Sequence, residues 1–270
     1  MKNLKKIGAA LAIAGGVAFA SGGASAVPVT VGGVTWDPAS AFDLGIFSAP
    51  LRETAVSNIG DELKGFGLVT NINNTTQNTF CVGCELTFVF DGFFVSDLID
   101  SNSDTIIDQV VFQGGSVRFY VDKSPDFTAA DSTSAGPDAD TKLWLEIAGH
   151  TSVNPLVNGG ATPGTLFSFL SPLGTVSAPG IGSIGQGVFD AVGGLAMPNF
   201  DTNTIVDFLN GFADFSFTSS FQFQPQGNPD YPIAGTGELF GDSIPEPATL
   251  ALVGAGLMGF GFARRRRTAK

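Results

Sequence analysis

Apolar and polar residues alternate along many short stretches of this chain, and this period of two constrains the fold more than any other feature. The stretch FSFTSSFQF, residues 215–223, is the clearest case. Phe215, Phe217, Phe221 and Phe223 fall on one face of an extended segment, and polar residues fall mostly on the other. Successive side chains of a β-strand point to opposite faces of the sheet. The stretch is therefore predicted to be a strand with its phenylalanines in the core.

The same alternation in three further stretches predicts an all-β domain. Residues 86–90, 117–121 and 143–147 carry apolar side chains at every second position, and clusters of Gly, Pro, Asn and Asp separate them as turns do. The predicted fold is an antiparallel β-sandwich or jelly-roll-like domain. Within it we expect mainly long loops over residues 151–187, with one strand at residues 165–170, and a short helix over residues 187–195.

Residues 1–26 have the three parts of a secretory signal peptide. Lys2, Lys5 and Lys6 come first, an apolar run follows, and the segment ends in ASA at residues 24–26. A positive start, an apolar stretch of about 7–15 residues and an A-x-A ending define such peptides. We therefore predict a signal helix that is cleaved off before Val27, and a β-rich exported domain over residues 27–243.

The exported part of the chain is strongly acidic. Residues 27–247 hold five Lys and Arg against all 25 Asp and Glu of the chain, a net charge of −20. A surface of this charge repels nucleic acid phosphates, so a nucleic acid partner is excluded. It keeps an exported protein soluble, and it attracts divalent cations or basic surfaces.

The two cysteines, Cys81 and Cys84, stand in the sequence FCVGCE. Outside the cytoplasm such cysteines tend to pair, so we expect a disulfide that closes a tight turn, with Gly83 at positive φ. A thioredoxin-type redox pair would need a helix after the first cysteine, where this sequence predicts a strand. A zinc site would need further ligands, and none is suitably spaced.

An acidic stretch that begins at residue 97 has regularly spaced oxygen-bearing side chains. The spaced residues are Asp100, Asn102, Asp104 and Asp108. Their spacing resembles the first nine positions of an EF-hand loop, but Thr105 stands where that loop has glycine and Val111 where it has its bidentate acid. Two interpretations stay open: a Ca²⁺ loop of another type, or a solvated Asp/Asn turn. No other cofactor is expected.

No assembly of catalytic residues stands out. His150 is the single histidine, it is expected to be an exposed turn residue, and no G-x-S-x-G motif accompanies it. The chain is therefore expected not to be an enzyme. A pair of carboxylates of the kind that glycosidases use stays open in so acidic a chain. A secreted carbohydrate-binding protein or glycan hydrolase is accordingly the alternative function.

The C-terminal stretch IPEPATLALVGAGLMGFGFARRRR, residues 244–267, joins three elements in order. Pro-Glu-Pro comes first, 16 uncharged residues follow at 248–263, and four arginines close the stretch. As a helix the uncharged run spans roughly 24 Å, against about 30 Å for the hydrocarbon core of a membrane. We predict a short transmembrane helix whose arginines stay on the cytoplasmic side.

This stretch resembles the PEP-CTERM sorting signal of Gram-negative bacteria. The motif residues are Pro245, Glu246, Pro247, Arg264, Arg265, Arg266 and Arg267. The resemblance implies an exosortase-type sorting enzyme as partner, transient anchoring in the membrane, and a final place at the cell surface or in the exopolysaccharide matrix.

The body is loosely similar to the flocculation-associated PEP-CTERM proteins. The stretches that carry this similarity are GVFDAVGGLAMPNFDTNT, FSFTSSFQF and GTGELFGDSIPEP. The resemblance implies a surface or matrix protein that supports cell aggregation or biofilm together with exopolysaccharide. It brings no catalytic residues with it.

Overall fold

The structure is a computed structural model and describes residues 27–40 and 44–244. Its principal strands are antiparallel neighbours in one large sheet, and the helices among the described residues are single turns. The elements are β1 (Val29–Val31), β2 (Val34–Trp36), β3 (Leu44–Glu53), β4 (Glu62–Ile72), β5 (Thr75–Thr76), α2 (Gln77–Phe80), β6 (Glu85–Ile99), β7 (Gln109–Asp122), β8 (Thr141–Gly149), β9 (Ser152–Val153), β10 (Pro163–Gly164), β11 (Leu166–Phe169), β12 (Ser183–Gly193), α3 (Met197–Phe200), β13 (Ile205–Val206), β14 (Phe212–Ala213), β15 (Phe215–Phe223) and β16 (Ile233–Gly241). Two 3₁₀ turns, Ser132–Ala135 and Asn158–Gly160, lie in the connections.

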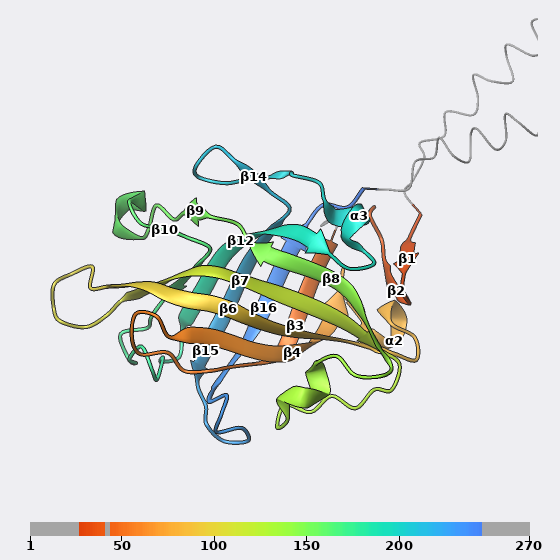
Figure 1. The fold of residues 1–270 in the computed structure, drawn as a ribbon, viewed down its shortest axis with the longest axis horizontal. Coiled ribbons are helices and arrows are strands. Elements are labelled where there is room, and N and C mark those ends of the chain that lie inside the picture. The colour runs from red at the N-terminus through yellow and green to blue at the C-terminus, as the bar shows by residue number, and fades with distance from the viewer. Residues whose placement is uncertain (1–26, 41–43, 245–270) are drawn as a thin grey trace, which may run out of the picture. The chain divides into compact units, whose positions relative to one another are not determined.

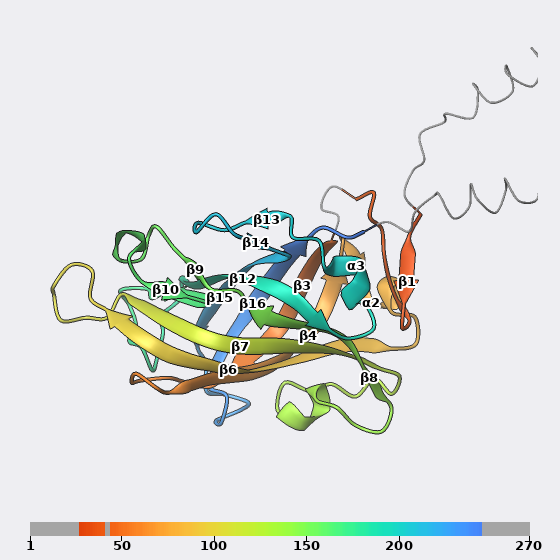
Figure 2. The same ribbon diagram turned by 45° about the horizontal axis from the view of Figure 1, so that its top comes forward.

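The large sheet closes on itself as a barrel (Figures 1 and 2). The neighbours run in the order β12, β15, β16, β3, β4, β6 and β7, and both β11 and β8 join β7 back to β12. β11 pairs Leu166 with Phe112 on one side and with Gly187 on the other, while β8 pairs Ile147 with Val117 and with Ala191. β11 and β8 thus share the eighth position of the barrel, one after the other along its axis.

The prediction of an all-β antiparallel fold is confirmed, but the sandwich or jelly-roll architecture is wrong. A sandwich has two sheets with open edges, whereas here one continuous sheet pairs its first strand with its last. Alternation within a strand is the same in both architectures, because each has one face toward the core. The closing pairs of β12 with β8 and β11 decide the architecture, and alternation says nothing about them.

The short helix predicted over residues 187–195 is also wrong, because most of that segment belongs to strand β12. β12 lies between β15 on one side and β8 with β11 on the other, so both edges of its backbone are hydrogen-bonded within the sheet. Phe189 and Ala191 are buried two residues apart, as a strand requires. The predicted signal helix and transmembrane helix lie outside the described residues. Within residues 27–40 and 44–244, no helix has the length and apolar character needed to cross a membrane.

The predicted inward faces of the strands are largely confirmed. Leu86, Phe88 and Phe90 are all buried on β6, and Phe215 is fully buried on β15. Phe223 departs from the expectation, since it is 44% exposed at the last position of β15. Period two alone cannot show where a strand passes beyond the core.

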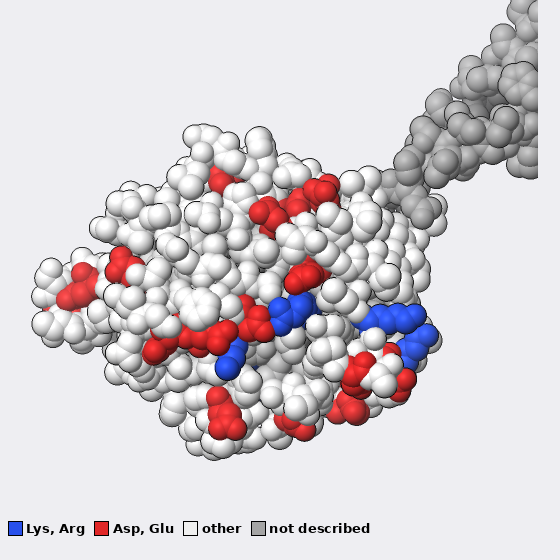
Figure 3. All heavy atoms as spheres, viewed as in Figure 1, with Lys and Arg blue, Asp and Glu red and all other residues white. Residues whose placement is uncertain are grey.

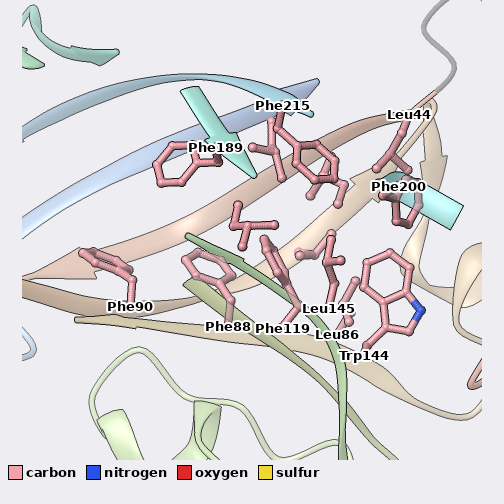
Figure 4. Packing of buried hydrophobic residues seen from close by; sticks show 14 of the residues in the cluster. Leu44, Leu86, Phe88, Phe90, Phe119, Trp144, Leu145, Phe189, Phe200 and Phe215 are labelled. Carbon is pink, nitrogen blue, oxygen red and sulfur yellow. The ribbon is translucent and has the colours of Figure 1, made fainter. Parts of the chain in front are cut away.

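One end of the barrel is closed by packed aromatic rings. Trp36 of β2 contacts Trp144 of β8 and Phe200 of α3, with ring centroids 6.1 and 4.9 Å apart. Figure 4 shows Trp144, Phe200 and Leu44 grouped at one end of the core, with Phe90 at the other. The last described residues lie beside this plug, because the Trp36 indole donates to Ser243 Oγ (3.1 Å) and the Ile244 amide donates to Asn199 O (2.8 Å). We call this group of rings the aromatic plug.

Glycines in the barrel wall make room for phenylalanines of the adjacent strand. Gly65 and Gly67 of β4 stand opposite Phe90 and Phe88 of β6. A Cβ atom added at either glycine would lie 2.4 Å from the Cζ atom of the facing ring, so each ring lies against bare backbone. This pairing connects two features of the composition, the 36 glycines and the 25 phenylalanines.

Candidate functional site

A cavity of about 90 Å³ lies inside the barrel, and side chains from all the barrel strands line it. Its wall is mainly apolar, and phenylalanine is the commonest residue in it. The phenylalanines in the wall are Phe88, Phe90, Phe93, Phe112, Phe119, Phe189, Phe217 and Phe221. Among the described residues that line it, Glu53 is the one ionisable side chain. Four hydroxyl side chains, of Ser48, Thr54, Ser168 and Ser219, also line the cavity. An apolar cavity with a few polar groups is the usual form of a small-molecule site.

Glu53 reaches the cavity because of its place in β3. Leu51 and Glu53, two residues apart, both line the cavity, whereas Arg52 between them donates to the Gln224 and Gln226 carbonyls (2.8 and 3.2 Å). The Glu53 backbone is held on both sides, by pairing with Gly65 of β4 and Ile233 of β16. β3 thus fixes a carboxyl group at the cavity wall.

Burial raises the pKa of Glu53 from 4.5 to about 8. Loss of hydration is the cause, because an apolar environment disfavours the charged form. Among the described residues no hydrogen bond or ion pair to its carboxyl group opposes that effect. Glu53 is therefore mostly a neutral acid at pH 7, without a hydrogen-bond or ion-pair partner in the described part of the chain. Sequence reasoning did not single it out.

Two loops complete the cavity at the Glu53 end. Thr54 and Val56 of the β3–β4 loop line it, together with Leu170, Val176 and Pro179 that follow β11. The second loop is tied down by backbone hydrogen bonds, from the Phe223 amide to Pro179 O (2.8 Å) and from the Leu170 amide to Asp108 O (2.7 Å). The aromatic plug occupies the other end, so a ligand would enter past these loops.

His150 lies in a different setting from the exposed turn that the sequence predicted. Its Nδ1 lies 2.8 Å from Asp190 Oδ2 and its Nε2 lies 2.9 Å from Asp207 Oδ2, and its side chain is 20% exposed. Burial alone would lower its pKa, but the hydrogen bonds to the two carboxylates outweigh burial and raise it. With both ring nitrogens engaged, His150 holds the Asp207 turn in place and has no nitrogen available as a general base.

A second acidic group was missed at the sequence level because it forms across strands. Glu85 and Asp122 are direct partners in β6 and β7, and their carboxylate oxygens lie with that of Asp126 within 4.8 Å of one another. Burial, together with the neighbouring acids, raises the pKa of Glu85 and of Asp122. Glu85 also accepts from the Asp126 and Phe127 amides (3.0 and 2.9 Å). Three carboxylates so placed can hold a cation.

The predicted calcium residues lie in the loop between β6 and β7, which projects from the barrel in Figure 1. Their oxygens accept from amides of the loop itself. The contacts are Asp100 Oδ2 with Thr105 N (2.7 Å), Asn102 Oδ1 with Asp104 N (2.9 Å), Asp104 Oδ1 with Ile106 N (2.8 Å) and Asp108 Oδ2 with Ser101 N (2.9 Å). These contacts shape the turn, and calcium binding here stays a prediction.

Cys81 and Cys84 form a disulfide in the structure, with their Cα atoms 5.2 Å apart. The intervening Gly83 has φ of 70°, and the Cys84 amide donates to Cys81 O (3.2 Å). The bond closes the turn between the single-turn helix α2 and strand β6. This disulfide lies outside the cavity, and neither cysteine lines the cavity wall.

Comparison with known proteins adds one finding, and it concerns the C-terminal stretch. Residues 243–267 match the family model of the PEP-CTERM protein-sorting motif. No curated protein and no solved structure matches the chain. The motif residues Pro245 to Pro247 and Arg264 to Arg267 lie outside the described residues. The motif indicates an exported protein that an exosortase-type enzyme processes, and this chain carries it at residues 243–267.

Proposed function

We propose that this protein is a non-enzymatic component of the cell surface or extracellular matrix, which supports cell aggregation together with exopolysaccharide. The sorting motif at residues 243–267 is the observation that carries the proposal. On this view the C-terminal run anchors the chain transiently in the membrane until the sorting enzyme releases it. The closed barrel then remains as the exported body.

The surface charge supports a role in a hydrated polymer matrix. In Figure 3, acidic side chains are spread over the visible face of the barrel, and basic side chains are few. The net charge of −20 over residues 27–247 would repel anionic polysaccharide in the absence of cations. Divalent cations that bridge carboxylates on the two polymers would turn this repulsion into cohesion. Aggregation should therefore depend on calcium.

The absence of enzymatic activity is part of the proposal, and the geometry of two sites supports it. Both ring nitrogens of His150 are engaged by carboxylates. A glycosidase needs two carboxyl groups on either side of the scissile bond, roughly 5–10 Å apart. The barrel cavity has one carboxyl group, Glu53, among its described lining residues, and its apolar wall does not suit a sugar. A binding or structural role fits these sites better than hydrolysis.

A deletion strain tests this function. The deletion strain is complemented either with the full chain or with a variant that has alanine at Pro245, Glu246 and Pro247. The three strains are compared for floc formation and matrix retention. We expect deletion to reduce flocculation, the full chain to restore it, and the alanine variant to fail. Normal flocs in the deletion strain would refute the aggregation role, and normal flocs with the alanine variant would refute its dependence on sorting.

A further inference from the structure

We propose that the barrel cavity binds a small apolar amine, with its hydrocarbon part among the phenylalanines and its ammonium group on the Glu53 carboxyl group. The site goes beyond the proposed matrix role, which makes no use of the barrel interior. The proposal rests on the size of the cavity, the composition of its wall, and the position of the Glu53 carboxyl group.

The wall of the cavity favours hydrocarbon over water. Protein interiors rarely keep voids larger than a water molecule, yet this one measures about 90 Å³. Water in a cavity needs two to four polar partners. Two of the four wall hydroxyls already have protein partners, because Ser48 Oγ donates to Gly237 O (3.2 Å) and Thr54 Oγ1 donates to Glu62 O (3.2 Å). The other two, Ser168 and Ser219, are polar groups in an otherwise apolar wall. The remaining space suits a short alkyl chain or a single ring.

Glu53 selects the polar end of the ligand. A carboxylate in apolar surroundings is stable only with a cation beside it. Within residues 27–40 and 44–244 no ion pair to Glu53 is formed, and the guanidinium of the adjacent Arg52 donates to the carbonyls of Gln224 and Gln226 instead. An ammonium group would fill that place, and the faces of the surrounding phenylalanine rings also attract a cation. The charge of −20 over residues 27–247 draws cations toward the barrel and repels fatty acids.

Amine binding would release a proton. Because burial raises the pKa of Glu53 to about 8, the group is protonated in the empty cavity at pH 7. The incoming ammonium keeps its hydrogens, Glu53 ionises to pair with it, and the Glu53 proton passes to the buffer. Below pH 8, each amine bound should therefore release close to one proton. Affinity should rise about tenfold per pH unit over that range and level off above it.

Calorimetry on the exported protein, purified as the cell releases it, tests the site. The probes are butylamine, butan-1-ol and butyrate, which share one chain and differ in the head group. We expect butylamine to bind at pH 6.5 with about one proton released, measured from the binding enthalpy in two buffers. Glu53→Gln should weaken butylamine at least tenfold and abolish the proton release. Asp230→Asn removes an exposed acid from the β15–β16 loop and should change neither.

Three results would overturn the proposal: no binding of butylamine, butanol binding as tightly as butylamine, or full amine affinity in Glu53→Gln. The second result would leave a plain apolar pocket without selectivity for amines. Ser219→Leu keeps Glu53 and fills the cavity from strand β15, so it should abolish butylamine binding while circular dichroism stays that of the parent. If Glu53→Gln fails to fold, Ser219→Leu and the proton release of the parent protein still decide the question.

Discussion

Replacing Glu53 by glutamine tests, at the scale of one residue, how a buried carboxyl group sets the pH response of the barrel. Its folded pKa of about 8 lies above the unfolded value of 4.5, so folding favours the protonated form. The stability linked to this group is fully present below pH 4.5 and is lost as the pH rises toward 8. Glu53→Gln should therefore raise the free energy of unfolding by roughly 2–4 kcal/mol at pH 8 and change it little at pH 4. Urea titrations at the two pH values measure this, with Asp230→Asn as control, and equal effects at both would contradict it.

His150 gives a second pH-dependent contribution at this scale, and it acts on one turn. The hydrogen bonds to Asp190 and Asp207 raise its pKa, so its contribution is present below its unfolded value of about 6.5 and is lost as the pH rises through the folded value. His150→Gln should destabilise the protein by about 1 kcal/mol at pH 5.5 and by less at pH 9. At the lower pH, the Leu209 and Gly211 amides, which donate to Asp207 Oδ1, should exchange their hydrogens faster in His150→Gln than in the parent protein. Unchanged exchange there would show that His150 does not hold the turn.

The calcium prediction also belongs to single residues. The spacing from Asp100 to Asp108 predicts millimolar or tighter Ca²⁺ binding to the exported protein. Asp104→Ala should weaken that binding several-fold, whereas Asp131→Ala removes a similar carboxylate from another loop and should not. A flat calorimetric titration of the parent protein at millimolar Ca²⁺ would end the prediction.

Among the elements, strand β4 shows what bare backbone contributes to the barrel wall. A Cβ atom on Gly67 would lie 2.4 Å from Phe88 Cζ and 2.8 Å from Pro50 O, so Gly67→Ala should destabilise the protein by about 2 kcal/mol. Adding Phe88→Leu should recover part of that loss by removing the ring. Gly136→Ala is the control, because the nearest atom to its added Cβ is 3.8 Å away. Thermal unfolding measures all three variants, and equal costs at Gly67 and Gly136 would contradict the ring-on-backbone packing.

Sequence reasoning succeeded for single strands and failed where distant strands meet. Leu86, Phe88 and Phe90 were predicted correctly because each strand carries its own two-residue period. The barrel closure was missed because it depends on pairs such as Ala191 with Ile147, which no local pattern encodes. Glu53 was missed for a related reason: β3 has bulges around Ser48 and Leu51, and these interrupt its alternation.

On the scale of the whole molecule, the sorting tail predicts a shortened mature protein. Moving four arginines across a bilayer is prohibitively costly, so residues 264–267 stay behind when the body is released. Mass spectrometry of matrix protein should show a C-terminus between residues 244 and 247. Peptides containing Arg264 to Lys270, recovered intact from secreted and membrane-free material, would show that the tail is not removed. The variant with alanine at Pro245, Glu246 and Pro247 should remain in the inner membrane.

The place of β16 in the sheet determines how the barrel would respond to tension on that strand. β16 is the last strand before the tail, and it lies between two partners, with nine residue pairs to β15 and eight to β3. A force directed along β16 would load both ladders in shear. Because the ladder hydrogen bonds run perpendicular to the strand axis, many must break together instead of one after another. Under such a force, strand β16 is therefore expected to resist extraction from the barrel as one cooperative unit.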